Sequence, residues 1–171
     1  MMEFPKRKPN RLKEFDYSQP NAYFITICTK NKEKLFWENV GASIARPEDM
    51  NLSQYGKIVK EAIEKIPNIY PTITVDNFVI MPNHIHLLLQ IHSDCNGRAM
   101  LAPTISNVVQ QMKGYVTKQI GKSVWQKLFH DHVIRRQQDY LKIWNYIEGN
   151  PSKWEEDCFY VKEEWDVPVN R

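Results

Sequence analysis

Two strand-like runs separated by only two residues constrain the fold of this chain more than any other feature. Residues 72–81 read TITVDNFVIM and residues 84–91 read HIHLLLQI. Both runs are rich in β-branched and other apolar side chains, as strands are. Pro82 and Asn83 stand between them, and a proline cannot continue a hydrogen-bonded ladder. The sequence therefore predicts a β-hairpin with its turn at these two residues.

The remaining segments each predict one strand or helix. From their β-branched content or helical spacing of apolar residues, we expect a strand at 22–29, a helix at 52–66, a helix from Thr104 as N-cap to Gly121 as stop, a strand at 124–135 and a helix at 139–151. The first six elements follow the β-α-β-β-α-β order of ferredoxin-like folds. We therefore predict an α+β, ferredoxin-like sandwich with an antiparallel sheet and a helical C-terminal extension.

Length and composition indicate a single domain. The 171 residues suit one domain over 1–171, with a basic N-terminal arm at 1–21 and the helical extension at 137–171. The chain has no apolar run long enough to span a membrane, and its first residues lack the apolar core of a secretory signal. We expect a cytoplasmic protein without a membrane partner. The net charge of +3 permits nucleic-acid binding without requiring it.

Two histidines interrupt the apolar pattern of the second hairpin strand. His84 and His86 point to the same face, because successive side chains alternate across a strand. Both imidazoles can then reach one metal ion. Two structural histidines held by hydrogen bonds are the alternative, since a short His-x-His motif is not specific. A third ligand is needed to decide between these interpretations.

The helix expected after the hairpin supplies a candidate third ligand. Gln119 falls at the edge of the apolar face, and Tyr115 lies one turn earlier on the same flank. The pair would present an amide oxygen and a phenol in one direction. Gly114 indicates a close approach of backbone or ligand, since a glycine within a helix costs about 1 kcal/mol relative to alanine. The alternative makes Tyr115 a boundary residue and Gln119 a solvated one.

Four segments together resemble a known family. They read MPNHIHLLL, VVQQMKGYVTKQI, LFHDHVIR and YIEGNPSKW, and they lie between about residues 23 and 154. This combination resembles the single-tyrosine transposases of insertion sequences that carry a His-hydrophobe-His motif. The last two segments look most like the branch of REP-associated tyrosine transposases.

The resemblance implies a function and a role for each site residue. It implies a DNA transposase that cleaves and rejoins single-stranded DNA through a 5′-phosphotyrosine intermediate. Tyr115 would be the nucleophile, and His84, His86 and Gln119 would bind a divalent metal, with Mg²⁺ or Mn²⁺ favoured. The substrate would be single-stranded or hairpin DNA. A homodimer is an open alternative to a monomer, because insertion-sequence relatives exchange the tyrosine helix between subunits.

Basic residues and a second histidine pair complete the set of candidates. His130 and His132 form another His-x-His, which we interpret as structural histidines held by hydrogen bonds, with a role at the metal site as the alternative. Cationic side chains near the tyrosine helix and in the N-terminal arm are candidates for contacts with DNA phosphates. They are Lys6, Arg7, Lys8, Lys113, Lys118, Lys122, Arg135 and Arg136. The alternative is that these charges only solvate the surface.

Two other classes of function are open. One is a catalytically silent, domesticated protein that only binds DNA hairpins. The other is a metal-dependent hydrolase that uses water as its nucleophile and does not need Tyr115. The HIHLLL run lacks the further aspartate that an HxHxDH-type hydrolase would show.

Overall fold

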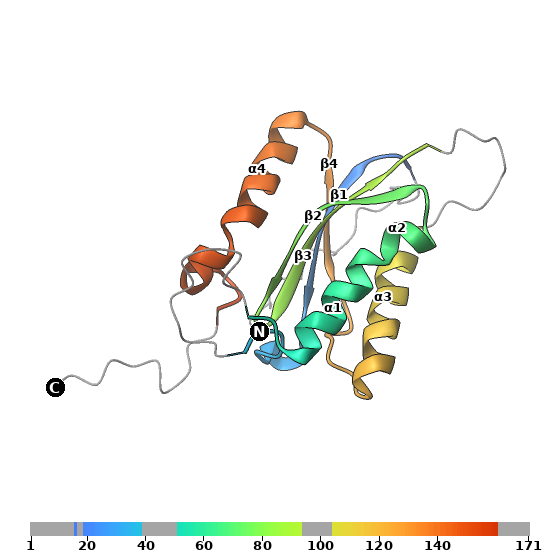
Figure 1. Ribbon diagram of the computed structural model, residues 1–171. Coiled ribbons are helices and arrows are strands. Elements are labelled where there is room, and N and C mark those ends of the chain that lie inside the picture. The colour runs from blue at the N-terminus through green and yellow to red at the C-terminus, as the bar shows by residue number, and fades with distance from the viewer. Residues whose placement is uncertain (1–15, 17–18, 39–50, 94–103, 161–171) are drawn as a thin grey trace, which may run out of the picture.

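A computed structural model of the chain describes residue 16 and residues 19–38, 51–93 and 104–160. Four strands form one antiparallel sheet in the order β2-β3-β1-β4 (Figure 1). The strands are β1 (Ala22–Cys28), β2 (Ile73–Met81), β3 (His84–Ile91) and β4 (His130–Ile134). Helices separate β1 from β2 and β3 from β4, so the predicted α+β, ferredoxin-like fold class is confirmed.

The predicted hairpin forms the centre of this sheet and one of its edges. β2 and β3 pair with Met81 opposite His84, so the turn consists of Pro82 and Asn83, as expected. The backbone carbonyls of these two turn residues accept hydrogen bonds of 2.8 to 3.1 Å from amide groups in residues 29–36. The segment after β1 therefore holds the turn, and with it the position at which His84 begins β3.

Helices cover both faces of the sheet. Figure 1 shows α1 (Gln54–Glu64) and α3 (Ile105–Ile120) side by side on one face, and α4 (Gln137–Gly149) on the other. A short helix α2 (Ile66–Ile69) follows α1, and a 3₁₀ turn η3 (Pro151–Glu156) follows α4. Among the described residues, no helix combines the length and the hydropathy of a membrane span.

The caps of α3 lie where the sequence places them. The Thr104 side chain accepts a hydrogen bond from the backbone amide of Asn107 at 3.3 Å. Gly121 ends the helix in the left-handed conformation, with φ of 81°. A side chain at that φ is strained, so glycine is the residue that such a stop favours.

The face of the sheet under α1 and α3 is mainly apolar. Ile85, Leu87 and Leu89 of β3 are fully buried there, beside Ile25 and Ile27 of β1. Burial of each such side chain contributes roughly 1.5–3 kcal/mol to the free energy of unfolding. This apolar layer joins the sheet to the two helices. The side chains of opposite parity, including His84 and His86, are left for the other face.

The last strand is shorter than predicted. Val124 and Trp125 are buried, but Trp125 forms only an isolated bridge with Thr29, and regular pairing begins at His130. The polar residues between these positions break the ladder. The expected strand at 124–135 is therefore reduced to five residues.

Gly56 of α1 is required by packing, which predicts a large effect of a small substitution. A Cβ at Gly56 would lie 2.2 Å from the backbone oxygen of Phe36, so Gly56→Ala should lower the free energy of unfolding by roughly 1–3 kcal/mol. Gly114→Ala is the matched control, because a Cβ there meets no atom within 4 Å. It should raise stability by up to about 1 kcal/mol. Urea unfolding measures both, and equal effects would contradict this account.

Candidate active site

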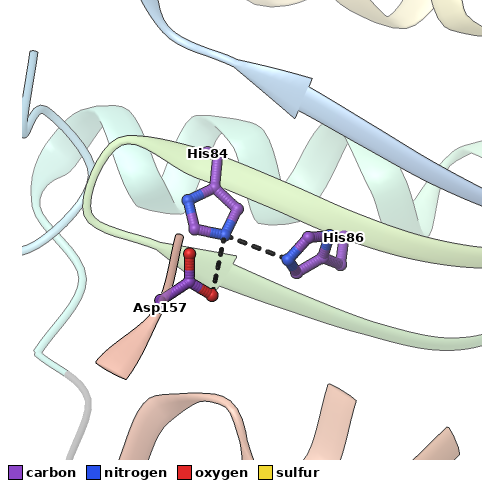
Figure 2. Close-up of side chains that lie close together, drawn as sticks. All are labelled: His84, His86 and Asp157. Carbon is purple, nitrogen blue, oxygen red and sulfur yellow. Dashed lines mark hydrogen bonds and ion pairs between the residues drawn. The ribbon is translucent and has the colours of Figure 1, made fainter. Parts of the chain in front are cut away.

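His84 and His86 lie at the beginning of β3, on the face opposite α1 and α3. Both side chains are buried, and their Nε2 atoms are 3.0 Å apart. The Asp157 carboxylate, which follows η3 in the chain, approaches them, with its Oδ2 4.0 Å from His84 Nε2 (Figure 2). One ligand atom from each of the three residues lies within 4.8 Å of the others. The strand geometry thus brings the predicted pair together and adds a carboxylate.

Asn83 fixes the tautomer of His84. Asn83 Nδ2 donates to the carbonyl oxygens of Lys32 at 3.3 Å and Phe159 at 2.9 Å, which leaves its Oδ1 facing the imidazole. This Oδ1 accepts a hydrogen bond from His84 Nδ1 at 2.9 Å. A neutral imidazole with its proton on Nδ1 presents a lone pair at Nε2. His84 therefore offers that nitrogen as a ligand atom.

His86 has a partner that allows either tautomer. Its Nδ1 lies 2.8 Å from the Thr26 hydroxyl, which can donate or accept. When Thr26 donates, the His86 proton lies on Nε2 and forms a hydrogen bond with His84. When Thr26 accepts, the proton moves to Nδ1 and the His86 Nε2 lone pair becomes available. The Phe24 ring, stacked on His86 at 5.1 Å between centroids, fixes the plane of the imidazole.

Burial keeps both imidazoles neutral. It lowers the pKa of His84 to about 3, and the positive charge of Lys32 acts in the same direction. It lowers the pKa of His86 to about 3 as well, with a further contribution from His84. Neutral imidazole is the form that binds metal ions. At neutral pH the pair is therefore in its ligand form.

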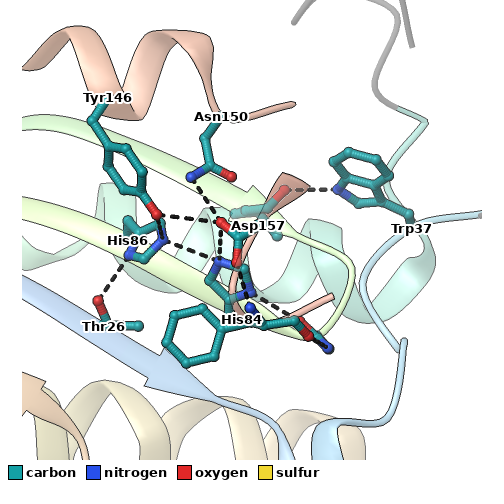
Figure 3. A network of polar contacts seen from close by, with 10 residues as sticks. Thr26, Trp37, His84, His86, Tyr146, Asn150 and Asp157 are labelled. Carbon is teal, nitrogen blue, oxygen red and sulfur yellow. Dashed lines mark hydrogen bonds and ion pairs between the residues drawn. The ribbon is translucent and has the colours of Figure 1, made fainter. Parts of the chain in front are cut away.

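Tyr146 of α4 contacts the histidine pair from the face of the sheet that α4 covers. Its hydroxyl lies 3.3 Å from His86 Nε2 and donates to Asp157 Oδ2 at 3.2 Å (Figure 3). Partial burial, together with the Asp157 charge, raises the pKa of the phenol to about 12. The residue is still 43% exposed. The phenol is therefore protonated at neutral pH, in contact with a proton acceptor, and open to a ligand from solvent.

Asn150, one helical turn after Tyr146, supplies the observation that fits a metal ion. Its Nδ2 donates to Asp157 Oδ2 at 3.1 Å, whereas its Oδ1 is buried without a hydrogen-bond partner in the described part of the chain. A buried oxygen left unpaired costs about 1–3 kcal/mol. A cation would satisfy it. Two neutral imidazoles with amide and carboxylate oxygens form a donor set that suits divalent ions.

Tyr115 and Gln119 lie away from the histidines. The Tyr115 hydroxyl donates to Glu61 at 3.0 Å and accepts from Lys65 at 2.8 Å, both from the α1 side of the sheet. Gln119 is exposed on α3. The prediction that these two side chains face the histidine pair is therefore wrong, because α3 packs on the other face of the sheet. The close approach expected at Gly114 also has no counterpart among the described residues.

His130 and His132 lie on the same face as the first histidine pair. In the β1–β4 register, His130 is opposite Thr26 and His132 is opposite Phe24, and both histidines are exposed. Neither ring forms a hydrogen bond within the described residues, so their interpretation as structural histidines held by hydrogen bonds is wrong. The strand β1 separates them from His86, and they are not part of the group of possible ligands that His84, His86 and Asp157 form in the described part of the chain.

The predicted DNA contacts fall into three groups. Lys113, Lys118 and Lys122 belong to α3 or its end, away from the histidines, and Lys113 donates to the backbone oxygen of Gln126 at 2.6 Å. Arg135 and Arg136 are exposed where β4 leads into α4. Lys6, Arg7 and Lys8 fall outside the described residues. The register places Arg135 and Arg136 at the end of the sheet near Gln90, away from His84.

The sequence reasoning missed Tyr146, Asn150 and Asp157. A signal for the first two was present, since Tyr146 and Asn150 have the same i, i+4 spacing as Tyr115 and Gln119. Tyr146 also falls outside the apolar set that defines the buried face of its helix. Asp157 gave no signal, because it follows an irregular segment whose path the sequence does not predict.

Comparisons with known proteins place this chain among relatives. No family model matches it. It is 36% identical over 174 residues to an uncharacterised protein of Haemophilus influenzae, covering 91% of this chain and 93% of that protein. It is 25% identical over 146 residues to a protein of the same organism described as a REP-associated tyrosine transposase, covering 81% and 74%. A solved REP-associated tyrosine transposase bound to a REP hairpin has a TM-score of 0.58 and 22% identity, covering 98% of this chain and 81% of that chain.

The donor set predicts binding of a divalent ion that depends on one histidine pair and not on the other. Mn²⁺ at a hundred times its dissociation constant should stabilise the chain by about 2.7 kcal/mol, and EDTA should reverse the effect. Replacing His84 and His86 by alanine should abolish the stabilisation, measured by thermal unfolding with and without Mn²⁺. The matched control replaces His130 and His132 by alanine and should keep it. Loss in the control, or retention in the first variant, would contradict the assignment.

Proposed function

We propose that this chain is a tyrosine transposase of the REP-associated type, and that it cleaves and rejoins single-stranded DNA through a covalent bond to Tyr146. The observation that carries the proposal is the position of the Tyr146 hydroxyl, 3.3 Å from His86 Nε2 and 3.2 Å from Asp157 Oδ2. A tyrosine in contact with a proton acceptor and a set of metal ligands has the parts of an activated nucleophile. In this proposal the nucleophile is Tyr146 and not Tyr115, the residue that the sequence resemblance implies.

In the proposed step, a phosphoryl group moves from the 3′-oxygen of the DNA to the Tyr146 oxygen. The Tyr146 oxygen attacks the phosphorus of a DNA phosphodiester, and the bond to the 3′-oxygen breaks. The products are a 5′-phosphotyrosine and a strand with a free 3′-hydroxyl. Asp157 Oδ2 accepts the phenolic proton, and the leaving 3′-oxygen takes a proton from water. A 3′-hydroxyl can later attack the phosphotyrosine in the reverse direction, so strands are rejoined without ATP.

We propose that His84, His86 and Asn150 hold a divalent ion, Mg²⁺ or Mn²⁺. Asn150 replaces Gln119 as the amide ligand, because its buried Oδ1 has no other partner in the described part of the chain. Asp157 Oδ2 already accepts hydrogen bonds from Tyr146 and Asn150. We therefore assign Asp157 the role of proton acceptor and not that of a metal ligand. When bound, such an ion neutralises charge on the phosphate that is attacked.

The proposed substrate is single-stranded or hairpin DNA. The solved relative that shares this fold is bound to a REP hairpin, which supports the same class of ligand here. His130 and His132 are exposed on the face that carries the site, and Arg135 and Arg136 follow β4 at the end of the sheet near Gln90, so they can contact phosphates of DNA that extends along this edge. Lys6, Arg7 and Lys8 stay proposed phosphate contacts.

Two further points of the substrate interaction concern α3 and oligomeric state. Lys113, Lys118 and Lys122 would meet only DNA that extends around the α3 side of the sheet.

Every residue proposed for the chemistry comes from one chain, so cleavage does not require the proposed alternative of a homodimer.

Tyr146→Phe is the decisive test of the nucleophile. The substitution removes one oxygen and keeps the ring, so DNA binding should survive while the covalent protein–DNA complex disappears. Tyr115→Phe is the matched control and should form the complex at the normal rate. A denaturing gel with a labelled single-stranded hairpin measures both variants.

The same gel separates the proposal from its rivals. A silent hairpin-binding protein predicts no covalent complex even in the unmodified chain. A hydrolase that uses water predicts that Tyr146→Phe still cuts DNA and that no adduct forms at any time. Loss of the complex in Tyr115→Phe instead of Tyr146→Phe would restore the assignment based on sequence.

Asp157→Asn should slow formation of the complex without removing the nucleophile. Loss of a proton acceptor lowers such rates by about 10²- to 10⁴-fold. The rate in the variant should recover as the pH rises, since hydroxide then takes the phenolic proton. Glu155→Gln, which removes an exposed carboxylate two residues away, is the control. Single-turnover kinetics across pH measure the effect, and an unchanged rate in Asp157→Asn would exclude Asp157 as the acceptor.

A further inference from the structure

A cavity of about 340 Å³ opens beside the proposed nucleophile. Tyr146, Asn150 and Asp157 of the proposed site form part of its wall, and Asn145, Gly149, Lys153 and Glu156 line it as well. Cavities that bind small ligands start at about 300 Å³, so this one is large enough for a nucleobase with its sugar. The proposed cleavage uses Tyr146, Asn150 and Asp157 on one side of the cavity. It gives no role to Asn145, Lys153 and Glu156.

Gly149 is the first sign that a ligand enters the cavity. It lies in the last turn of α4 without a left-handed φ, and a Cβ at this position would meet no atom within 4 Å. Neither the backbone nor packing within the described residues therefore requires glycine. Alanine would favour the helix, since glycine is the less stable residue there. A side chain at Gly149 would occupy space that the cavity now keeps open.

The polar side chains around the cavity are the second sign. Asn145, Lys153 and Glu156 are exposed, and none of their side chains forms a hydrogen bond or ion pair within the described part of the chain. Lys153 offers hydrogen-bond donors, and Glu156 offers acceptors. A hydrogen-bond donor and a hydrogen-bond acceptor at one cavity suit a ligand that carries both a carbonyl and an amino group. Guanine and cytosine carry both groups, whereas adenine lacks the carbonyl and thymine lacks the amino group.

We propose that this cavity binds a nucleobase next to the scissile phosphate and prefers guanine or cytosine. Glu156 accepts from the exocyclic amino group, and Lys153 donates to the carbonyl oxygen. A base held there anchors the strand while its neighbouring phosphate lies at Tyr146. The inference rests on the proposed function, because it identifies the ligand as a nucleotide of the DNA that is cleaved.

Binding of single nucleotides tests the inference without any need for cleavage. The full chain is titrated with dGMP, dCMP, dAMP, dTMP and deoxyribose 5-phosphate, and NMR chemical shifts give the dissociation constants. We expect dGMP or dCMP to bind roughly tenfold more tightly than dTMP and the base-free sugar phosphate. Glu156→Gln should reduce this preference, because it replaces an acceptor by a mixed group.

Two glycine variants test whether the cavity is the binding site. Gly149→Ala should weaken nucleotide binding about tenfold while the helix stays folded. Gly114→Ala makes the same change on α3, away from the cavity, and should leave binding unchanged. Equal binding of all five probes, or an unchanged affinity in Gly149→Ala, would overturn the inference.

The outcomes distinguish this inference from the proposed function. A covalent Tyr146 adduct without any base preference would overturn the base-binding cavity and leave the cleavage proposal intact. A base preference that Gly149→Ala removes, in a chain that forms no adduct, would support the cavity and overturn the cleavage proposal. Tyr146→Phe should keep the base preference, since the phenolic oxygen is assigned to the phosphate.

Discussion

The two-residue period of β3 decides where every other part of the site can lie. His84 and His86 point to one face of the strand, and Ile85 and Leu87 point to the other. The helices α1 and α3 must cover the apolar face, because that is where burial stabilises the fold. The histidines are therefore turned away from both helices. The side chains that approach them from outside the sheet, Tyr146 and Asp157, follow the completed sheet in the chain.

The histidine pair is organised by the turn that precedes it. Asn83 bonds to Lys32, to Phe159 and to His84, so one side chain links the segment after β1, the end of the described chain and a ligand tautomer. Tyr146 and Asn150 are brought to the same point by α4. Their position depends on α4 lying across β2, where Tyr140 donates to Asp76 at 2.8 Å and Asn77 donates to Glu148 at 3.0 Å. These two polar contacts with β2 thus fix the position of the proposed nucleophile relative to the histidines.

The order of elements, the hairpin and both caps of α3 could be predicted, because each depends on local patterns of a few residues. The histidine pair could be predicted as a convergent set for the same reason. The partner helix could not be identified by spacing alone, since Tyr115 with Gln119 and Tyr146 with Asn150 share one spacing. Parity resolves the choice: the apolar side chains of β3 must face α3, so a tyrosine on α3 cannot face His86. Asp157 depends on the path of an irregular segment and on long-range contacts that no short pattern encodes.

The distribution of the site along the chain has a consequence for synthesis. The sheet histidines are made roughly 70 residues before Asp157, and at about 5–20 residues per second this interval lasts roughly 4 to 14 seconds. The hairpin, with its paired imidazoles, can therefore form on the ribosome while the segment that carries the nucleophile is still missing. A nascent chain in that interval has the histidine pair but not the side chains that complete the candidate site.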